Sequence, residues 1–450
     1  MKTNRREFLR SAGWASLALL GVPRFARGSE SLAPDPDGLL ALAPGFSYRV
    51  IARTGDEMSD GLLMPGSPDG MGVFAGPNGR LILVRNHEQV LAHRQTSAFG
   101  AQLERLDRVA RERLYDVGPG GVPQLGGTTS LRYDPATGRV EASWLSLGGT
   151  VRNCAGGTTP WGSWLSCEEC TDRAGGAFAR DHGFVFEVPA SAEPSLTAAR
   201  PLAALGRMNH EAAVVDPASG VVYLTEDRAN SLFYRFLPEV PGVLERGGTL
   251  QALRIRDGLS DTRNRKDDGP SFPKSRPFAV DWVTLDGVDS PADDLRTRGH
   301  AEKRAALFQR GEGIYASSAG IFFACTTGGA AERGQIFRYV PSEREGRNGE
   351  SARPGMLELF LEADATTALH QPDNLTVAPF GELFVCEDGG GSDGLVRIDA
   401  RGNLSTLARN LYTDSELTGV CFAPDGKTLF VNLQQPGITF AITGPFRQRG

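Results

Sequence analysis

Ala212-Ala213-Val214-Val215 is followed by the turn Asp216-Pro217-Ala218-Ser219-Gly220 and then by Val221-Val222-Tyr223-Leu224-Thr225-Glu226-Asp227. Two short apolar runs joined by a turn that contains Pro and Gly are typical of a β-hairpin. The same unit recurs, at irregular intervals along the chain, in segments 130–140, 313–325, 374–388 and 419–431. Repeated hairpins of this kind predict an all-β fold, a six-bladed β-propeller forming one domain over residues 45–450. A β-sandwich is the alternative architecture.

Composition agrees with many short strands. The 450 residues include 56 Gly and 28 Pro, which are spread as turns between apolar runs. The formal net charge of -6 gives no support for nucleic-acid binding. Two segments interrupt the repeats: 98–113 has apolar residues at helical spacing and predicts a short helical insertion, whereas the charged segment 256–276 predicts an exposed loop.

The N-terminus has the pattern of a targeting segment. Asn4-Arg5-Arg6-Glu7-Phe8-Leu9-Arg10 follows the twin-arginine export pattern, and an apolar run and small residues at Ala26-Arg27-Gly28 come after it. We expect residues 1–28 to be a twin-arginine signal peptide that engages the twin-arginine translocase, and the protein to be periplasmic or secreted. The apolar run is too short for a stable membrane span.

One cysteine lies in a Gly-rich turn beside a strand that ends on two carboxylates. Asn153-Cys154-Ala155-Gly156-Gly157 leads into a strand that ends at Cys167-Glu168-Glu169. A soft thiolate beside hard oxygen ligands suits a mixed metal site. Of the six cysteines, those at 325, 386 and 421 lie in apolar strands and are expected to be buried core thiols.

Acidic residues recur where the hairpins begin or end. The series comprises Glu88, Glu168, Glu169, Glu211, Glu226, Asp227, Glu312, Asp373, Glu387, Asp388 and Glu416. If the innermost strands of a propeller bring these carboxylates to one axis, they repel one another unless cations neutralise them. The alternative is that they are solvated strand ends that point outward.

Four motifs carry a resemblance to a known family. They are Arg85-Asn86-His87-Glu88, the segment 153–169, the segment 206–212 with its His210-Glu211, and the segment 424–432. Together they look like the PhoX-type alkaline phosphatase family. The resemblance implies twin-arginine export, a six-bladed propeller, and hydrolysis of phosphate esters at a cluster of two ferric and three calcium ions joined by an oxo group.

The resemblance also implies roles for individual residues. Cys154 would be an iron-binding thiolate, with Glu211 and Glu312 as further iron ligands. Arg310 would bind the phosphate through its guanidinium, and Asn153 would donate to another phosphate oxygen. The implied calcium ligands are Glu88, Glu168, Glu169, Asp227, Asp373, Glu387 and Asp388.

The expected function is a secreted metal-dependent phosphatase that acts on small-molecule phosphate monoesters, with diesters as a second substrate class. One alternative is a calcium-dependent lactonase-like hydrolase, because Pro372-Asp373-Asn374-Leu375 resembles the strand pattern of gluconolactonases. Another is a non-catalytic, calcium-stabilised binding propeller. The sequence contains no Ser-His-Asp arrangement, phosphate-binding loop or dinucleotide fingerprint that would favour other chemistry. We expect a monomer.

Overall fold

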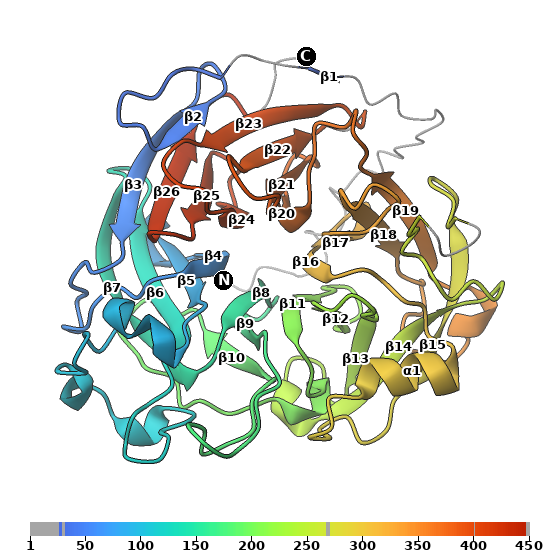
Figure 1. Ribbon diagram of the computed structural model, residues 1–450, viewed down its shortest axis with the longest axis horizontal. Coiled ribbons are helices and arrows are strands. Elements are labelled where there is room, and N and C mark those ends of the chain that lie inside the picture. The colour runs from blue at the N-terminus through green and yellow to red at the C-terminus, as the bar shows by residue number, and fades with distance from the viewer. Residues whose placement is uncertain (1–26, 29–31, 267–270, 400, 447–450) are drawn as a thin grey trace, which may run out of the picture.

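The computed structural model describes residues 27–28, 32–266, 271–399 and 401–446. Within these residues the strands form five sheets arranged in a ring around a central axis (Figure 1). The expectation of an all-β ring of sheets is therefore confirmed. The predicted signal peptide, residues 1–28, lies almost entirely outside the described residues.

The first two sheets follow the chain directly. One contains β4 (Pro68–Ala75), β5 (Leu81–His87), β6 (Gly126–Asp134) and β7 (Arg139–Thr150). The next contains β8 (Asn153–Thr158), β9 (Ser163–Glu168) and β10 (Val185–Pro189). Neighbouring strands within each sheet are antiparallel. The first strand of each sheet lies at the axis and the last at the periphery (Figure 1).

The largest sheet has nine strands and consists of two halves joined at the periphery. Its first half is β11 (His210–Val215), β12 (Val222–Glu226), β13 (Tyr234–Pro238), β14 (Gly248–Ile255) and β15 (Phe278–Thr284). Its second half is β16 (Gly311–Ser317), β17 (Gly320–Cys325), β18 (Gln335–Val340) and β19 (Met356–Glu362). A short β15–β19 pairing joins the halves, so that β11 and β16 are the two ends of the sheet.

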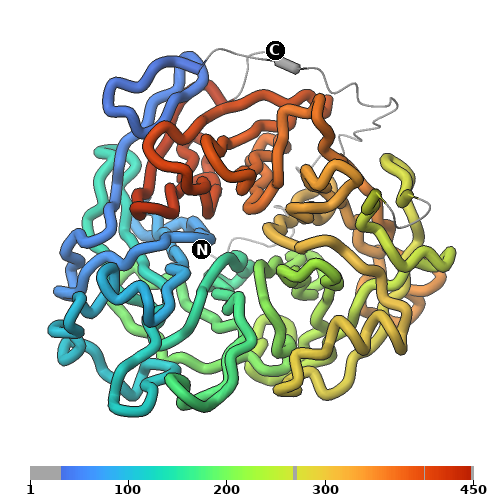
Figure 2. Tube along the Cα trace, in the orientation of Figure 1, coloured from blue at the N-terminus to red at the C-terminus, as the bar shows by residue number. Residues whose placement is uncertain are grey.

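Two further sheets complete the ring. One contains β20 (Pro372–Val377), β21 (Leu383–Glu387), β22 (Gly394–Ile398) and β23 (Leu404–Asn410), with β1 (Arg27–Gly28) and β2 (Leu40–Leu42) paired to β23. The other contains β24 (Leu417–Phe422), β25 (Thr428–Leu433) and β26 (Ile438–Thr443). The N-terminal strand β3 (Ser47–Arg53) pairs with β26, so strands from opposite ends of the sequence lie side by side (Figure 2).

The core fills the spaces between neighbouring sheets. Between the two halves of the nine-stranded sheet, for example, Phe233 stacks on Phe323 with ring centroids 4.3 Å apart, and Phe308 packs edge-on against Phe323. Burial of one such side chain stabilises the fold by about 1.5–3 kcal/mol. The strands nearest the axis are buried on both faces, which explains why their sequences are almost continuously apolar or small.

Helical structure is sparse and differs from the prediction. The α-helix α1 spans Leu295–Lys303. The predicted helix at 98–113 is replaced by turns and two 3₁₀ helices, η3 (Leu106–Arg108) and η4 (Arg111–Arg113), because Leu103 adopts φ of 60° and interrupts any continuous helix. The remaining 3₁₀ helices are η1 (Pro77–Gly79), η2 (Leu91–Thr96), η5 (Ala203–Leu205), η6 (Leu244–Arg246) and η7 (Glu350–Ala352).

The segment 256–276 contains no helix or strand in its described part, as predicted, but it is not exposed throughout, because Thr262 and Phe272 are buried. Among the described residues, no helix is both long and apolar enough to cross a bilayer.

Candidate metal centre

The strands nearest the axis present their side chains to one another in a ring. These inner strands are β4, β8, β11, β16, β20 and β24, and each contacts the next around the axis. The second residue of five of them is an acid or a thiol, namely Asp69, Cys154, Glu211, Glu312 and Asp373. In the sixth position Glu416 directly precedes β24. Each inner strand therefore delivers one potential ligand at the same height of the ring.

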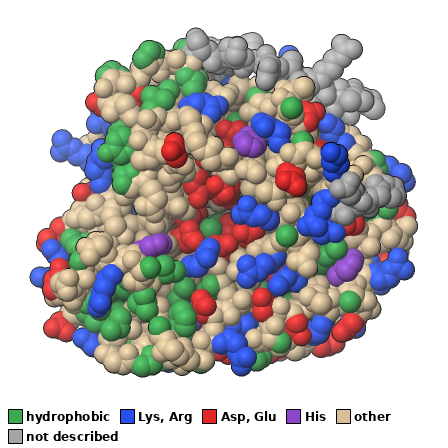
Figure 3. Space-filling view, viewed as in Figure 1, with side chains coloured by type: hydrophobic (Ala, Val, Ile, Leu, Met, Phe, Trp, Pro, Cys, Tyr) green, Lys and Arg blue, Asp and Glu red, His purple; other side chains and the backbone are tan. Residues whose placement is uncertain are grey.

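For four of the six inner strands, an acid also follows the strand that pairs with it. Glu88, Glu169, Asp227 and Asp388 come directly after β5, β9, β12 and β21. Together the two sets form what we call the acidic cluster: Asp69, Glu88, Cys154, Glu169, Glu211, Asp227, Glu312, Asp373, Asp388 and Glu416. Figure 3 shows acidic side chains gathered at the centre of one face, with basic side chains around them.

Within the cluster, three groups bring their ligand atoms within 4.8 Å of one another: Asp69 with Glu88 and Cys154, Cys154 with Glu169 and Glu211, and Glu211 with Glu312 and Asp373. Cys154 and Glu211 each belong to two groups, so the three groups are linked in a chain. This geometry suits several cations held side by side by shared ligands.

A β-bulge turns each ligand toward the axis. The pairing register of every inner strand shifts just at or after its ligand position, as between Pro68 and Met71 in β4 and between His210 and Ala213 in β11. The corresponding shifts lie in β8, β16, β20 and β24. Bulges reorient side chains next to functional sites.

The backbone entering several inner strands is also strained. Ser67, Arg152, Arg310 and Gln371, each directly before an inner strand, have φ of 45°, 48°, 52° and 49°. This left-handed conformation is unfavourable for residues other than Gly, and such residues cluster at functional sites.

Polar side chains that follow or lie in the second strand of one hairpin fix the ligand-bearing strand of the next hairpin around the axis. Asn86 donates to the carbonyl oxygen of Ala155 at 2.7 Å, and Thr225 donates to that of Glu312 at 2.6 Å. Thr326 donates to the carbonyl oxygen of Pro372 at 3.0 Å, and Asn432 donates to that of Asp69 at 2.7 Å. The ligand positions are thus tied to one another around the ring.

Glu211 is the member of the cluster whose charge is least compensated by its surroundings. Its side chain is fully buried, and neither carboxylate oxygen has a hydrogen-bond partner among the described residues. Burial, with Glu312 and Asp373 nearby, raises the pKa of Glu211 well above its ordinary value. A buried carboxylate without a donor costs several kcal/mol unless it is protonated or neutralised by a cation.

Other members of the cluster show the same perturbation. Burial and the charge of Glu88 raise the pKa of Glu169 to about 8, and burial and Asp388 raise that of Asp373 to about 7. Burial and the surrounding carboxylates also raise the pKa of the Cys154 thiol. These acids are not stable together as anions in the absence of positive charge.

Two arginines supply part of that charge. Arg152 forms ion pairs with Glu88 at 3.1 Å and Glu169 at 2.6 Å. Arg310 holds Asp227 through Nε at 2.8 Å and Nη2 at 3.1 Å, and its Nη2 lies 2.9 Å from Glu312. Two guanidinium groups cannot balance nine carboxylates, so the donor set fits additional cations: hard oxygen ligands for calcium and a thiolate for a softer ion such as iron.

Two of the predicted calcium ligands lie away from the cluster. Glu168 and Glu387 are the last residues of β9 and β21, so they point to the opposite side from Glu169 and Asp388. Glu387 accepts hydrogen bonds from the backbone amides of His370 and Gly394. Glu226, another member of the acidic series, is the last residue of β12 and also points away from the cluster. Its carboxylate accepts hydrogen bonds from Tyr234 and Arg296.

Asn153 does not reach the ring either. Its side chain donates to Ser166 at 2.9 Å and accepts from Thr150 at 2.6 Å, so it fastens β8 to its neighbours. The other predicted positions, Cys154, Glu211, Glu312, Glu88, Glu169, Asp227, Asp373, Asp388 and Arg310, are brought together.

Sequence reasoning missed Asp69 and Arg152 and did not assign Glu416 a ligand role. A signal for Asp69 was present, because Pro68-Asp69-Gly70 repeats the pattern of Pro372-Asp373-Asn374 at the same position of an inner strand. The hairpin that it opens is rich in glycine, which obscures the apolar pattern.

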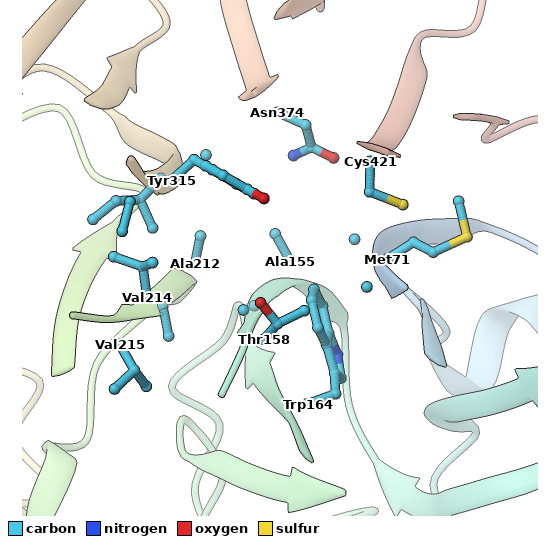
Figure 4. A pocket seen from close by; sticks show the side chains of 18 of the residues that line it. Met71, Ala155, Thr158, Trp164, Ala212, Val214, Val215, Tyr315, Asn374 and Cys421 are labelled. Carbon is cyan, nitrogen blue, oxygen red and sulfur yellow. The ribbon is translucent and has the colours of Figure 1, made fainter. Parts of the chain in front are cut away.

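Below the ring of ligands the axis contains an uncharged cavity of about 300 Å³. Met71, Val214, Trp164 and Tyr315 are among the side chains that line it (Figure 4). No charged residue lines this cavity in the described part of the chain.

Comparisons with known proteins agree with this geometry. A family model described as alkaline phosphatase PhoX matches residues 27–437. A solved structure of Pseudomonas fluorescens PhoX, in complex with the transition state analogue vanadate, is 17% identical, with a TM-score of 0.67, and the match covers 93% of this chain and 98% of that one. No curated protein sequence matches the chain.

Gluconolactonases are more distant in structure. One from Xanthomonas campestris is 13% identical with a TM-score of 0.41, covering 90% of this chain and 98% of that one. A periplasmic gluconolactonase from Pseudomonas aeruginosa is 14% identical with a TM-score of 0.40, covering 87% and 89%. Scores this low carry no argument about function.

Proposed function

The chain belongs to the PhoX alkaline phosphatase family, whose members are phosphomonoesterases, and on this basis we propose that it hydrolyses phosphate monoesters at a metal cluster held by the acidic cluster. Phosphate diesters are proposed as a second substrate class. The observation that carries the proposal is the chain of three ligand groups joined through Cys154 and Glu211.

We assign iron to the thiolate side of the cluster and calcium to the remaining acids. Cys154, Glu211 and Glu312 would hold iron. Cys154 and Glu211 share one ligand group, and Glu211 and Glu312 share the next. Glu88, Glu169, Asp227, Asp373 and Asp388 would hold calcium, together with Asp69 and Glu416, each of which has a buried oxygen without a partner among the described residues. The saturated Glu168 and Glu387 are left out of this assignment.

When bound, these ions would supply Lewis-acid charge for the phosphoryl oxygens. The chain itself would orient the substrate through Arg310, which is one-third exposed at the mouth of the cluster. Asp227 and Glu312 engage its Nε and Nη2, and no described residue bonds to its Nη1. This nitrogen would donate to a phosphoryl oxygen and offset the charge that develops there.

Arg310 is held ready for this role by its neighbours. Burial alone would lower its pKa, but the carboxylates of Glu312 and Asp227 raise the pKa above its ordinary value, so the guanidinium remains charged. Its bidentate pair with Asp227 fixes the plane of the group before substrate arrives. Asn153, whose side chain is bonded to Ser166 and Thr150, is not assigned to the substrate.

We also propose that the ring has six blades, counting each half of the nine-stranded sheet as one, and that the protein is exported by the twin-arginine route to the periplasm or beyond. The inner-strand contacts around the axis support the blade count. The basic and apolar pattern of residues 4–28 supports export. A monomer is proposed.

The test combines elemental analysis with turnover. Protein exported by its own host is analysed for iron and calcium and assayed for release of phosphate from a generic aryl phosphate, with and without added calcium. We expect iron and calcium to be bound, and activity to be lost in Cys154→Ala. Calcium alone with no phosphate release would refute the proposal and favour a lactonase-like hydrolase or a binding propeller.

A further inference from the structure

Glu168 occupies the centre of a fully buried hydrogen-bond network beside the acidic cluster. Its Oε1 accepts from the backbone amide of Val151 at 3.0 Å and lies 2.6 Å from Nδ1 of His182. Its Oε2 accepts from the amides of Gly183 at 2.8 Å and Phe184 at 3.2 Å. A carboxylate has about four acceptor positions, so Glu168 has none left for a cation. This is the opposite of Glu211, whose carboxylate oxygens have no hydrogen-bond partner in the described part of the chain.

His182 connects Glu168 to a third buried side chain. Its Nε2 lies 3.0 Å from Oδ2 of Asp116, and the side chains of Asp116, His182 and Glu168 are all inaccessible to solvent. Asp116 in turn accepts from the backbone amides of Ala179 at 3.0 Å and Arg180 at 3.2 Å. The imidazole therefore fixes the segment 179–184 against the end of β9.

The residues bonded to Glu168 are close in sequence or by hydrogen bonds to three parts of the acidic cluster. Val151 precedes Arg152, which pairs with Glu88 and Glu169, and Cys154 follows two residues later. Glu169 is the residue next to Glu168 itself.

The third path runs through Gly183 to the strand that carries Glu211. The carbonyl oxygen of Gly183 accepts from the amide of Met208 at 3.1 Å. The next residue, Asn209, donates to Glu169 at 3.2 Å, and Glu211 lies two residues further on. Cys154, Glu169 and Glu211 are the members of the central ligand group.

We propose that Glu168, held by His182 and Asp116, is a positioning residue that sets the metal affinity of this central group without binding metal itself. The inference rests on the proposed metal cluster. Residues that orient ligands in this way usually change metal affinity by about 10- to 100-fold when they are altered.

The test uses Co²⁺ as the probe, because a cobalt–thiolate bond gives an absorption band that reports on Cys154 directly. Chelator-treated protein is titrated with Co²⁺ for the wild type, Glu168→Gln and His182→Gln, and bound metal per chain is measured at saturation. Glu168→Gln keeps the shape of the side chain but places an NH₂ group against backbone N–H donors. The matched control is Glu345→Gln, which also alters a buried and fully bonded carboxylate, here held by Arg235 and Tyr339 away from the cluster.

We expect Glu168→Gln and His182→Gln to require about 10- to 100-fold more Co²⁺, yet to reach the wild-type band and stoichiometry at saturation, while Glu345→Gln titrates as the wild type. Wild-type affinity in Glu168→Gln overturns the inference. So does a lower stoichiometry at saturation, which would make Glu168 a ligand, or an equal loss in Glu345→Gln, which would make the effect one of general stability.

Asp116→Asn provides a milder variant if Glu168→Gln does not fold, and it should weaken Co²⁺ binding in the same direction. A wild-type protein that binds no metal refutes the proposed function itself. That result is distinct from a variant that binds as tightly as the wild type.

Discussion

Removal of the metal should make the stability of the protein fall with rising pH, and Glu169 allows the effect to be measured. In the folded, metal-free protein the pKa of Glu169 is raised to about 8 from an ordinary value of 4.5. Between these values the folded state holds a proton that the unfolded state has lost, so the free energy of unfolding decreases as pH rises. The stabilisation is complete below about pH 4.5 and is lost as pH passes through 8.

The magnitude follows from linkage. Each pH unit in this window is equivalent to about 1.4 kcal/mol for one such proton. From pH 6.5 to 8 this gives about 2 kcal/mol, reduced to about 1.5 kcal/mol because Glu169 is half ionised at pH 8. The buried His87 and His210, whose pKa values burial lowers, contribute a change of opposite sign mainly below pH 6.5, which is why the window starts there.

The assay is urea unfolding of chelated protein at pH 6.5 and 8, for the wild type and for Glu169→Gln. The wild type should lose about 1.5 kcal/mol more than the variant over this interval, since the amide cannot titrate and all other groups are common to both. With calcium and iron restored, the wild-type loss should disappear, because cations bind the ionised form. Equal pH dependence in the two chelated proteins, or a wild type that becomes more stable toward pH 8, would show that Glu169 does not carry the raised pKa.

Three further outcomes are expected. Arg310→Lys should lower kcat/KM for an aryl phosphate about 100-fold, because an ammonium cannot replace the planar guanidinium at the phosphoryl oxygen; a change within twofold would contradict this role. Cys154→Ser should abolish the cobalt–thiolate band, whereas Cys167→Ser, at a core position, should retain it; loss in both would point to a general effect. Gly70→Ala should destabilise the protein by about 1–3 kcal/mol, because the added Cβ would lie 2.5 Å from Cα of Ala155. Urea unfolding measures this; an unchanged midpoint would mean that the neighbouring strands separate without cost.

The hairpins of the fold could be predicted because their causes are local. The two apolar runs of 212–227 became the buried strands β11 and β12, and the turn at Asp216 formed as expected. The helix predicted at 98–113 was wrong for the opposite reason. Its apolar residues are buried by distant parts of the chain, which helical spacing alone does not reveal.

The site was predicted in its residue types but not in all its members. Adjacent acids such as Glu168 and Glu169 look equivalent in sequence, yet strand alternation places Glu169 at the axis and Glu168 in a buried hydrogen-bond network beside it. The strand end determines which of the two faces the axis, and sequence locates a strand end only to within about two to four residues. Asp69 was missed since its hairpin lacks a continuous apolar run, although its position repeats that of Asp373.

The pairing of β3 with β26 has a consequence for the order in which the protein forms. Gln434 donates to Asp69 at 3.0 Å and to Glu88 at 3.2 Å, across 365 and 346 positions of sequence. Contacts over such separations are slow to form, so the ligand set is complete only after the last strands have been synthesised and have met the first. If the proposed cations bind the complete ligand set, they would stabilise the closed ring over open forms and so favour chains whose two ends have paired.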